Sequence, residues 1–497
     1  MLTVLANLLF AASHHSILSS SSSRPQRSFG HFQRAKCHHQ DLSALVLSLS
    51  QSFESRDDIA SDLPITHQER FSRFHTSTYH ASHIERILLL SDLHCDYATN
   101  REWLQNICSK PSNDLSKTMI LVAGDVSHNL EILQWTFRTL KDAFGEVTFV
   151  PGNHDIWLDK PRKHKPVATK LDSDDDALSN VDLKLSGTGD GCTNSVEKLE
   201  KLFELCVEED VRIGPVKIEN EQSDLWIIPL LSWYHPSFDT EPPIQGWGGI
   251  PSARKVVADY RKAKWPEPLS LLDDSIALFM DELNDIIFNF DSDIPDKSAT
   301  IITYSHFLPR VDLLPEKRYL SLPTLHSCVG STFLESRLRN LNSHFGGLKD
   351  IEHLHAFGHS HLSWDQNIDK VRYIHVPLAY PREWEQRRRS LEIGTMQGEV
   401  SDNRFPVCIW EKDAQSNDLK DGFPHEWLGG WWSKYYSIMK RQPHRNTELA
   451  PWVARRFRQL PGGFIEDFDH IKVEMEHKLH HPRILKTGTG PWYNVTK

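Results

Sequence analysis

Apolar runs that end at turn-forming residues recur along the chain and predict a series of β-strands. Each run is short, rich in aliphatic residues and followed closely by Gly, Pro, Ser, Asp or Asn. The runs are RILLL (86–90), TMILVAG (118–124), VTFVPG (147–152), LWIIPLL (225–231), ATIITY (299–304), HLHAFG (353–358), VRYIHVP (371–377) and PVCIW (406–410).

Amphipathic segments lie between several of these runs, with apolar residues spaced three and four apart. One is predicted to begin at Asn100, a favourable N-cap residue, and another covers 129–145 and closes on a glycine. Two more cover 195–209 and 269–290. The alternation of strands and helices predicts an α/β fold.

Three segments depart from this alternation. Residues 160–194 are polar and contain DSDDD and SGTGDG, which predicts a mobile surface insertion. Residues 236–268 contain DTEPPIQGWGGIP and are interpreted as a second long loop. Bunched aromatic residues after Trp410 favour packing against the main domain over a ligand platform. We therefore predict a main domain over 61–412 and an aromatic-rich C-terminal extension over 413–497 that packs on it.

The first forty residues differ in composition from the rest of the chain. They have no acidic residue before Asp41, contain a run of five serines, and carry the basic residues Arg24, Arg27, Arg34 and Lys36. This composition is typical of an organelle transit peptide, so we expect 1–60 to target the protein, to plastids before mitochondria because serine outweighs arginine. The apolar run LTVLANLLFAA leaves a secretory signal as the alternative, although no basic residue precedes it.

Charge and cysteine content narrow the classes of function. A net charge of −11 gives no support for a broad nucleic-acid-binding surface. No apolar stretch is long enough to span a bilayer. The seven cysteines are odd in number and lack C-x-x-C spacing, which predicts reduced, mostly structural thiols. The sequence leaves the oligomeric state open.

Polar clusters follow the carboxyl ends of five predicted strands. The stretch FVPGNHDIW shows the pattern: a β-branched run stops at Pro-Gly and at once presents an amide, an imidazole and a carboxylate. The other clusters are SDLHCDY, AGDVSHN, YSHF and FGHSH. Ligands of open α/β sheets bind at the carboxyl ends of strands, so we expect the five clusters to converge on one crevice.

The side chains in these clusters are suited to binding transition metals. They offer oxygen and imidazole ligands of the kind that Mn, Fe or Zn accepts, without a thiolate. Asp-x-His and His-x-His place two side chains on the same side of an extended segment. The candidate metal ligands are Asp92, His94, Asp125, Asn153, His306, His359 and His361.

In this order and spacing, the five clusters resemble the calcineurin-like metallophosphoesterase superfamily, over residues 85 to 380 or so. The blocks LLSWYH and YPREW resemble a plant and bacterial branch of that family. The resemblance implies an α/β fold of four layers, α/β/β/α, in which two mixed sheets are flanked by helices. It also implies a centre of two divalent or trivalent metal ions.

The resemblance implies a role for each candidate residue. One metal is bound by Asp92, His94 and His361, and Asp125 bridges both ions. The second metal is bound by Asn153, His306 and His359. His154 resembles the family's general acid, which donates a proton to the leaving oxygen when a metal-activated hydroxide attacks a phosphate ester.

Three further residues near the clusters have weaker assignments. Asp155 either caps the next segment or orients His154, and Asp96 is expected to hydrogen-bond a metal-bound imidazole. His128, four residues after Gly124, is a candidate for substrate contact, although a satisfied surface histidine is the more frequent case.

Three functions remain open at this point. We expect a phosphomonoesterase acting on a phosphorylated small molecule or protein. The first alternative is a phosphodiesterase or nuclease with the same centre, because GDxxH with His128 resembles some nuclease and diesterase members. The acidic composition weighs against nucleic acid as a substrate. The second alternative, a scaffold without catalysis, is disfavoured because none of the seven ligands is missing.

Overall fold

The protein was analysed as a computed structural model, which describes residues 67–109, 115–158, 190–219, 223–246, 250–267, 269–271, 273–288, 298–345, 351–383, 406–412, 431–450 and 453–454. The predicted transit peptide, nearly all of the predicted insertion and most of the C-terminal extension lie outside these residues. The domain boundaries predicted at 60 and 412 stay a prediction.

One sheet of the described structure has four strands in the order β11-β2-β3-β4. Its parallel part consists of β2 (Arg86–Leu90), β3 (Thr118–Ala123) and β4 (Glu146–Val150). The outer strand β11 (Val407–Glu411) pairs antiparallel with β2. Nearly every residue of these strands is buried, which explains their continuous apolar sequence.

The second sheet has seven strands, in the order β1-β5-β6-β7-β8-β10-β9. Its four central strands run parallel: β6 (Ser223–Pro229), β7 (Ser298–Tyr304), β8 (Glu352–Phe357) and β10 (Val371–His375). Antiparallel pairs lie towards both edges, where β5 (Val216–Ile218) pairs with β6 and β9 (Trp364–Ile368) pairs with β10. The short strand β1 (Tyr79–His80) pairs parallel with β5.

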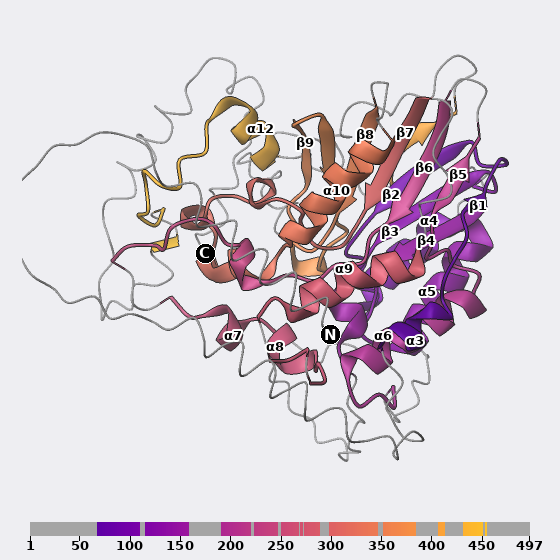
Figure 1. The fold of residues 1–497 in the computed structure, drawn as a ribbon, viewed down its shortest axis with the longest axis horizontal. Helices are drawn as coiled ribbons and strands as arrows, with labels where there is room; N and C mark the ends of the chain where they lie inside the picture. The colour runs from indigo at the N-terminus through magenta and orange to yellow at the C-terminus, as the bar shows by residue number, and fades with distance from the viewer. Residues whose placement is uncertain are drawn as a thin grey trace, which may run out of the picture. The chain divides into compact units, whose positions relative to one another are not determined.

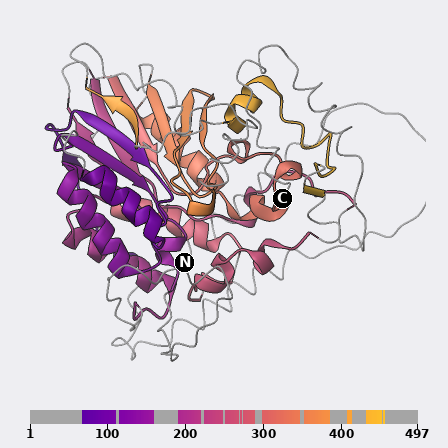
Figure 2. The ribbon, with the colours of Figure 1, turned by 180° about the vertical axis from the view of Figure 1, so that it is seen from behind.

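Helices connect the parallel strands and cover the sheets. The four-stranded sheet is connected through α4 (Ala98–Cys108) and α5 (Leu130–Ala143), and the seven-stranded sheet through α9 (Ser275–Ile287) and α10 (Thr332–Phe345). Figure 1 shows α9 and α10 on the near side of the strands, and the view from behind in Figure 2 shows α4 and α5 beside the four-stranded sheet. The predicted fold of two mixed sheets flanked by helices is confirmed.

Further helices and short turns complete the described structure. They are α3 (His67–Ser72), α6 (Ser195–Glu208), α7 (Ala253–Val256), α8 (Asp259–Lys262), α12 (Trp431–Ile438) and the short 3-10 turns η1 (His154–Ile156), η2 (Pro236–Phe238), η3 (Val311–Leu313), η4 (Lys317–Tyr319) and η5 (Pro323–Cys328). From the predicted C-terminal extension, α12 packs against β9, with Trp432 in the core. No helix in the described part of the chain combines the length and apolarity that crossing a bilayer requires.

Each predicted apolar run coincides with a strand to within a few residues, but β1, β5 and β9 were not predicted and one helix start was wrong. The sequence predicts that Asn100 caps a helix, whereas α4 begins at Ala98 and Tyr97 occupies the cap position. Asn100 is buried, and its amide Nδ2 donates hydrogen bonds to the carbonyl oxygens of Leu93 and Ala379. The amide therefore ties together two loops beside the site instead of satisfying the helix end.

The two sheets meet at the carboxyl ends of their central strands. An isolated bridge joins Ser91, directly after β2, to Pro377, which follows β10. The amide N–H of Leu378 donates to the carbonyl of Ser91, and that of Ala379 to the carbonyl of Asp92. The loops after β2 and β10, about 285 residues apart in sequence, are thereby held against each other at one edge of the sandwich.

Candidate active site

The backbone turns sharply at most of the predicted ligands. Five of them adopt positive φ angles: 51° at Asp92, 43° at His94, 56° at Asp125, 73° at His359 and 54° at His361. Residues other than glycine seldom occupy this left-handed region, which costs free energy unless the surroundings enforce it. Such outliers gather at functional sites, and here they turn side chains from the strand ends inward.

Three glycines allow the loops to approach one another. A Cβ added to Gly152 would lie 2.2 Å from Oδ1 of Asp125, and one added to Gly124 would lie 2.5 Å from Nδ1 of His306. A Cβ on Gly358 would lie 2.7 Å from the carbonyl oxygen of Ala123. These positions exclude any side chain, which explains why glycine precedes three of the polar clusters.

The structure brings the candidate ligands into two groups that share one residue. The first contains Asp92, His94, Asp125 and His361, whose ligand atoms lie within 4.8 Å of one another. The second contains Asp125, His306 and His359 at the same spacing. This division, with Asp125 common to both, is the one that the family resemblance implies. The binding of ions by these residues stays a prediction.

Asn153 joins the second group through its amide oxygen. Oδ1 of Asn153 lies 3.0 Å from Nε2 of His306 and 2.9 Å from Nδ1 of His359. Its Nδ2 donates to Oδ1 of Asp259 at 2.8 Å, which fixes the amide so that its oxygen faces the histidines. Asn153 can thus supply an oxygen ligand without adding negative charge.

Hydrogen bonds on the far side of three rings determine which nitrogen faces the centre. His306 donates from Nδ1 to the carbonyl of Ala123, and His359 donates from Nε2 to the carbonyl of Cys328. Nδ1 of His361 is 2.8 Å from Oε2 of Glu383. Such partners fix the tautomer of a metal-binding histidine and leave its other nitrogen with a free lone pair.

Lone pairs consequently converge on both groups. Nε2 of His361 faces Nε2 of His94 at 2.9 Å and Oδ1 of Asp92 at 3.5 Å. Nε2 of His306 lies 3.4 Å from Oδ1 of Asp125. Nitrogen and oxygen lone pairs at these distances repel one another unless a proton or a metal ion lies between them. The donor set therefore fits divalent or trivalent transition-metal ions.

Protonation of the rings agrees with this role for the most part. Burial lowers the pKa of His94 to about 4 and that of His359 to about 3, so both rings are neutral and able to bind metal at neutral pH. Burial also opposes protonation of His306, but the charge of Asp125 outweighs it and raises the pKa to about 9. A metal cation beside Asp125 would offset the charge of that carboxylate and lower the pKa of His306 again.

Asp92 is held by partners on both of its oxygens. Oδ2 accepts a hydrogen bond from Ser91 Oγ at 2.6 Å and lies 3.0 Å from Nε2 of His375, while Oδ1 accepts from the backbone N–H of His359. Burial raises the pKa of Asp92, but the hydrogen bond from His375 and the charge of His361 prevail and lower it. The carboxylate of Asp92 is therefore ionised although it is buried.

Asp155 holds in place the loop that carries His154, the candidate general acid. Its carboxylate accepts backbone hydrogen bonds from Gly152, Asp125, Val126 and Ser127, all within 2.9 Å. The sequence predicts that Asp155 caps the next segment or orients the ring of His154. It instead fastens the turn after β4 to the turn after β3, because it accepts from four N–H groups that would otherwise be buried without a partner.

His154 lies over the carboxylate of Asp125, between two aromatic residues. Its Nε2 is 3.9 Å from Oδ2 of Asp125 and 3.2 Å from the hydroxyl of Tyr380, and its ring stacks on Trp157 at 3.5 Å. Burial lowers the pKa of His154 well below its usual range, against the charge of Asp125. An anionic phosphate beside the ring would raise this pKa again and favour the protonated acid.

Asp96 and His128 form a pair at the margin of the site. Nδ1 of His128 lies 3.0 Å from Oδ1 of Asp96, which also accepts a hydrogen bond from Ser127 Oγ at 2.6 Å. The sequence predicts that Asp96 bonds a metal-bound imidazole. Among the described contacts, Nδ1 of His94 has no hydrogen-bond partner, so this prediction is wrong for that ring.

Sequence reasoning missed four residues that complete the site: His375, Tyr380, Glu383 and Asp259. His375 interrupts an apolar strand, and this irregularity was a usable signal. Tyr380 and Glu383 lie in the YPREW block, whose sequence indicates a family branch and not a role in the site. Asp259 lies in a segment interpreted as a loop, where no sequence pattern singled it out.

Residues 85–245 match the model of the calcineurin-like phosphoesterases. The chain carries a calcineurin-like phosphoesterase domain. The matched residues include the clusters after β2, β3 and β4, whereas His306, His359 and His361 lie beyond them and are placed by the fold. The domain is that of a hydrolase acting on phosphate ester bonds.

Two comparisons relate the chain to the same bacterial protein. It is 24% identical over 306 residues to the acyl-carrier-protein phosphodiesterase PptH of Mycobacterium tuberculosis, covering 60% of this chain and 79% of that protein. The crystal structure of the phosphopantetheinyl hydrolase PptH from Mycobacterium tuberculosis matches with a TM-score of 0.43 and 19% identity, covering 62% of this chain and 93% of that chain.

Proposed function

We propose that this chain is a metal-dependent phosphodiesterase that cleaves a phosphate ester joining a substituent to a protein or small-molecule carrier. The convergence of lone pairs from seven side chains, around two groups that share Asp125, carries the proposal. Two ions of Mn, Fe or Zn held there would supply a nucleophilic water and neutralise charge on the phosphoryl group. The residues around them determine the remaining steps.

The protein's own side chains supply orientation and a proton. Far-side hydrogen bonds to the carbonyl oxygens of Ala123 and Cys328 and to the carboxylate of Glu383 hold the three imidazoles in place before substrate binds. His154, above Asp125, donates its proton to the departing oxygen. Trp157 and Tyr380 restrict the ring to that position, so that little reorientation is required during reaction.

The choice of a diester over a monoester rests on the relative and on the walls of the site. The sequence alone favours a monoesterase. The relative in Mycobacterium tuberculosis is named as an acyl-carrier-protein phosphodiesterase. Around His154 the walls are Trp157 and Tyr380, which are uncharged. Neutral aromatic walls suit an esterified phosphate with one negative charge and a second substituent.

A substrate panel tests this proposal directly. Protein from residue 61 onward, loaded in turn with Mn, Fe or Zn, would be assayed with a bis-aryl phosphodiester, an aryl phosphomonoester and a holo-acyl carrier protein. We expect the diesters to be cleaved with higher kcat/KM than the monoester, and the carrier protein to lose the mass of its prosthetic arm. Preferential cleavage of the monoester would restore the monoesterase interpretation.

The same panel distinguishes a nuclease from a scaffold without catalysis. Single-stranded and double-stranded DNA belong in it, and faster cleavage of DNA than of the aryl diester would identify a nuclease. If the metal-loaded protein cleaves none of these esters, the scaffold hypothesis is favoured.

A further inference from the structure

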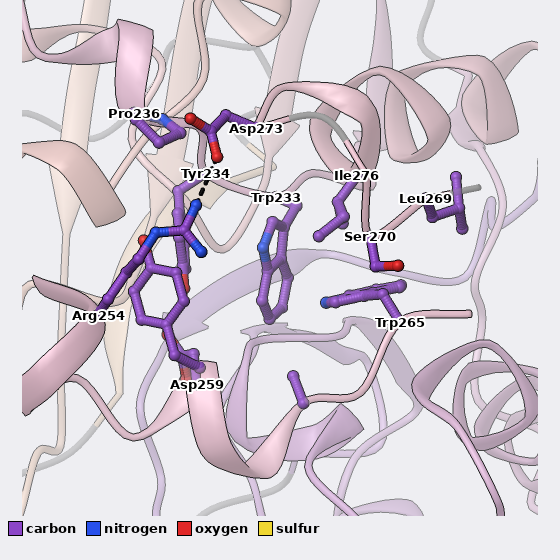
Figure 3. A pocket seen from close by; sticks show the side chains of 12 residues that line it. Trp233, Tyr234, Pro236, Arg254, Asp259, Trp265, Leu269, Ser270, Asp273 and Ile276 are labelled. Atoms are coloured by element: carbon purple, nitrogen blue, oxygen red, sulfur yellow. Dashed lines mark hydrogen bonds and ion pairs between the residues drawn. The ribbon is translucent and has the colours of Figure 1, made fainter. Parts of the chain in front are cut away.

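A pocket lies beside the second group of candidate ligands. It encloses about 180 Å³ and is built from the chain after β6, from α7 and α8, and from the start of α9. Figure 3 shows Arg254 and Asp259 on one side of it, Trp265 and Leu269 on the other, and Trp233 between them. This pocket contains none of the seven candidate metal ligands.

Most of the residues that line the pocket are aromatic or aliphatic, although polar atoms contribute as much of its surface as apolar atoms do. Trp233 stacks with Tyr234 at 5.1 Å and meets Trp265 edge-on at 5.1 Å. Leu269 and Ile276 add aliphatic surface. At one side, Arg254 and Asp273 neutralise each other in an ion pair at 2.5 Å. The wall therefore favours an uncharged occupant.

One carboxylate connects this pocket to the catalytic centre. Oδ1 of Asp259 accepts hydrogen bonds from Nδ2 of Asn153 and from Nε1 of Trp157. The residue is 2% exposed, and its Oδ2 receives no hydrogen bond of ordinary geometry from the described residues. The phenol of Tyr234 also interacts with this carboxylate and opposes the rise in its pKa that burial causes. A buried carboxylate oxygen at a pocket wall is an acceptor for a ligand N–H or O–H.

The volume indicates what part of a ligand the pocket can hold. Pockets that enclose a whole drug-sized ligand measure roughly 300–1,000 Å³. At about 180 Å³ this one is smaller, and it accommodates one arm of a larger molecule. The shared residue Asp259 places that arm next to the phosphoryl group, which would lie over Asn153 and His154.

From this geometry we infer that the pocket is the substrate subsite for an uncharged chain carrying an amide or hydroxyl donor, esterified to the phosphate that the centre cleaves. The inference rests on the proposed phosphodiesterase function. The chain packs against Trp233 and Trp265 and donates a hydrogen bond to Oδ2 of Asp259. An arm that ends in a carboxylate is rejected, because it would meet the charge of Asp259.

The test uses four diesters with the same nitrophenyl leaving group and a second substituent that is methyl, hexyl, acetamidopropyl or carboxypentyl. With the metal-loaded protein, we expect kcat/KM for the acetamidopropyl diester to exceed that of the methyl diester on the order of 10-fold, and the carboxypentyl diester to be poorer than the hexyl diester. Equal rates for all four would overturn the subsite.

Two neighbouring substitutions provide the matched control. Ser270→Trp fills the pocket from an exposed position in its wall, whereas Leu271→Trp adds the same bulk at an adjacent residue that is 63% exposed and does not line it. Ser270→Trp should abolish the preference for the acetamidopropyl diester over the methyl diester. Leu271→Trp should retain the preference. Equal loss with both diesters in Ser270→Trp would contradict the proposal.

A binding measurement separates this inference from the proposed function. Saturation-transfer NMR with N-(hydroxypropyl)acetamide needs no turnover. We expect transfer to this alcohol in the parent protein and in Leu271→Trp, and none in Ser270→Trp. Turnover of the methyl diester without transfer would uphold the phosphodiesterase and reject the subsite. Transfer without turnover of any diester would uphold the subsite and reject the phosphodiesterase.

Discussion

The hydroxyl of Tyr380 lies 3.2 Å from Nε2 of His154, although the two residues come from different sheets. His154 follows β4 in the four-stranded sheet, and Tyr380 follows β10 in the seven-stranded sheet. The ring of Tyr380 also packs on that of His94 at 4.3 Å. The candidate proton donor His154 is thus positioned by a residue that reaches it only when the two sheets are correctly joined.

Tyr380→Phe should weaken acid catalysis without disturbing the metals. We expect kcat to fall roughly 2- to 10-fold for esters with poor leaving groups, in keeping with the loss of one neutral hydrogen bond worth about 0.5–1.5 kcal/mol. Steady-state kinetics and elemental analysis check this. The control is Tyr436→Phe, because the hydroxyl of Tyr436 accepts a hydrogen bond from the N–H of Glu316 instead. A fall of the same size in both variants would contradict the role of Tyr380.

His154→Ala tests the assignment of the acid itself. Metal content should remain intact, since the ring is absent from both groups that share Asp125, although it forms a third close group with His94 and Asp96. Turnover of alkyl esters should fall about 10²–10⁴-fold, whereas activated aryl esters should lose much less because they leave without a proton. Equal losses across a leaving-group series, or loss of metal, would show that His154 has another role.

Asp125→Asn should reduce metal content more than any other single substitution, because Asp125 belongs to both groups. We expect the content to fall from about two ions per chain to one or fewer in elemental analysis. Asp224→Asn is the control: this carboxylate is also buried, but it pairs with Lys217 at 3.1 Å. One ion or none in the parent protein would count against a dinuclear centre.

Gly152→Ala should impair the site by steric contact. The new methyl group would lie 2.2 Å from Oδ1 of Asp125, so the turn after β4 must move. We expect lower metal retention on dialysis and a fall in kcat/KM on the order of 10²-fold, as small displacements at a positioned site produce. Gly246→Ala, where no atom lies within 4 Å of the new carbon but φ is +75°, should cost about 1 kcal/mol of stability and leave the metals unchanged.

The predicted import of the protein into plastids can be tested independently of its catalytic activity. A fusion of residues 1–60 to a fluorescent protein should enter plastids in a plant cell, because the segment is serine-rich, basic and free of acidic residues before Asp41. Microscopy with plastid and mitochondrial markers provides the measurement. Secretion of the reporter, or its retention in the cytosol, would reject the transit-peptide interpretation.

The parts of the fold that sequence predicted share a simple physical origin. Buried parallel strands such as β3 require apolar side chains on both faces, and they stand out as uninterrupted runs. The edge strand β9, WDQNI, is only partly buried and carries no such signal, so it was missed. Helix α10 was also missed, because its apolar residues are few among charged and polar ones.

The same contrast between local and tertiary signals explains which residues of the candidate site could be predicted from the sequence. The seven ligands follow strand ends and match family motifs, so their convergence was predictable. Asp259 reaches the site only because α8 lies against the turn at Asn153, a contact between residues 106 positions apart. Tertiary contacts of this kind leave no periodic or local trace in the sequence, and the adjoining pocket was unpredictable for the same reason.

The pairing of β11 with β2 has a consequence for how the chain is synthesised. Every candidate metal ligand has left the ribosome once residue 361 has emerged, yet Ile87 pairs with Trp410. Until that last strand arrives, the outer edge of β2 presents free backbone N–H and C=O groups, which is a template for aggregation. Nascent chains stalled between 361 and 407 should therefore depend on chaperones, even though all seven candidate ligands and His154 have already been synthesised.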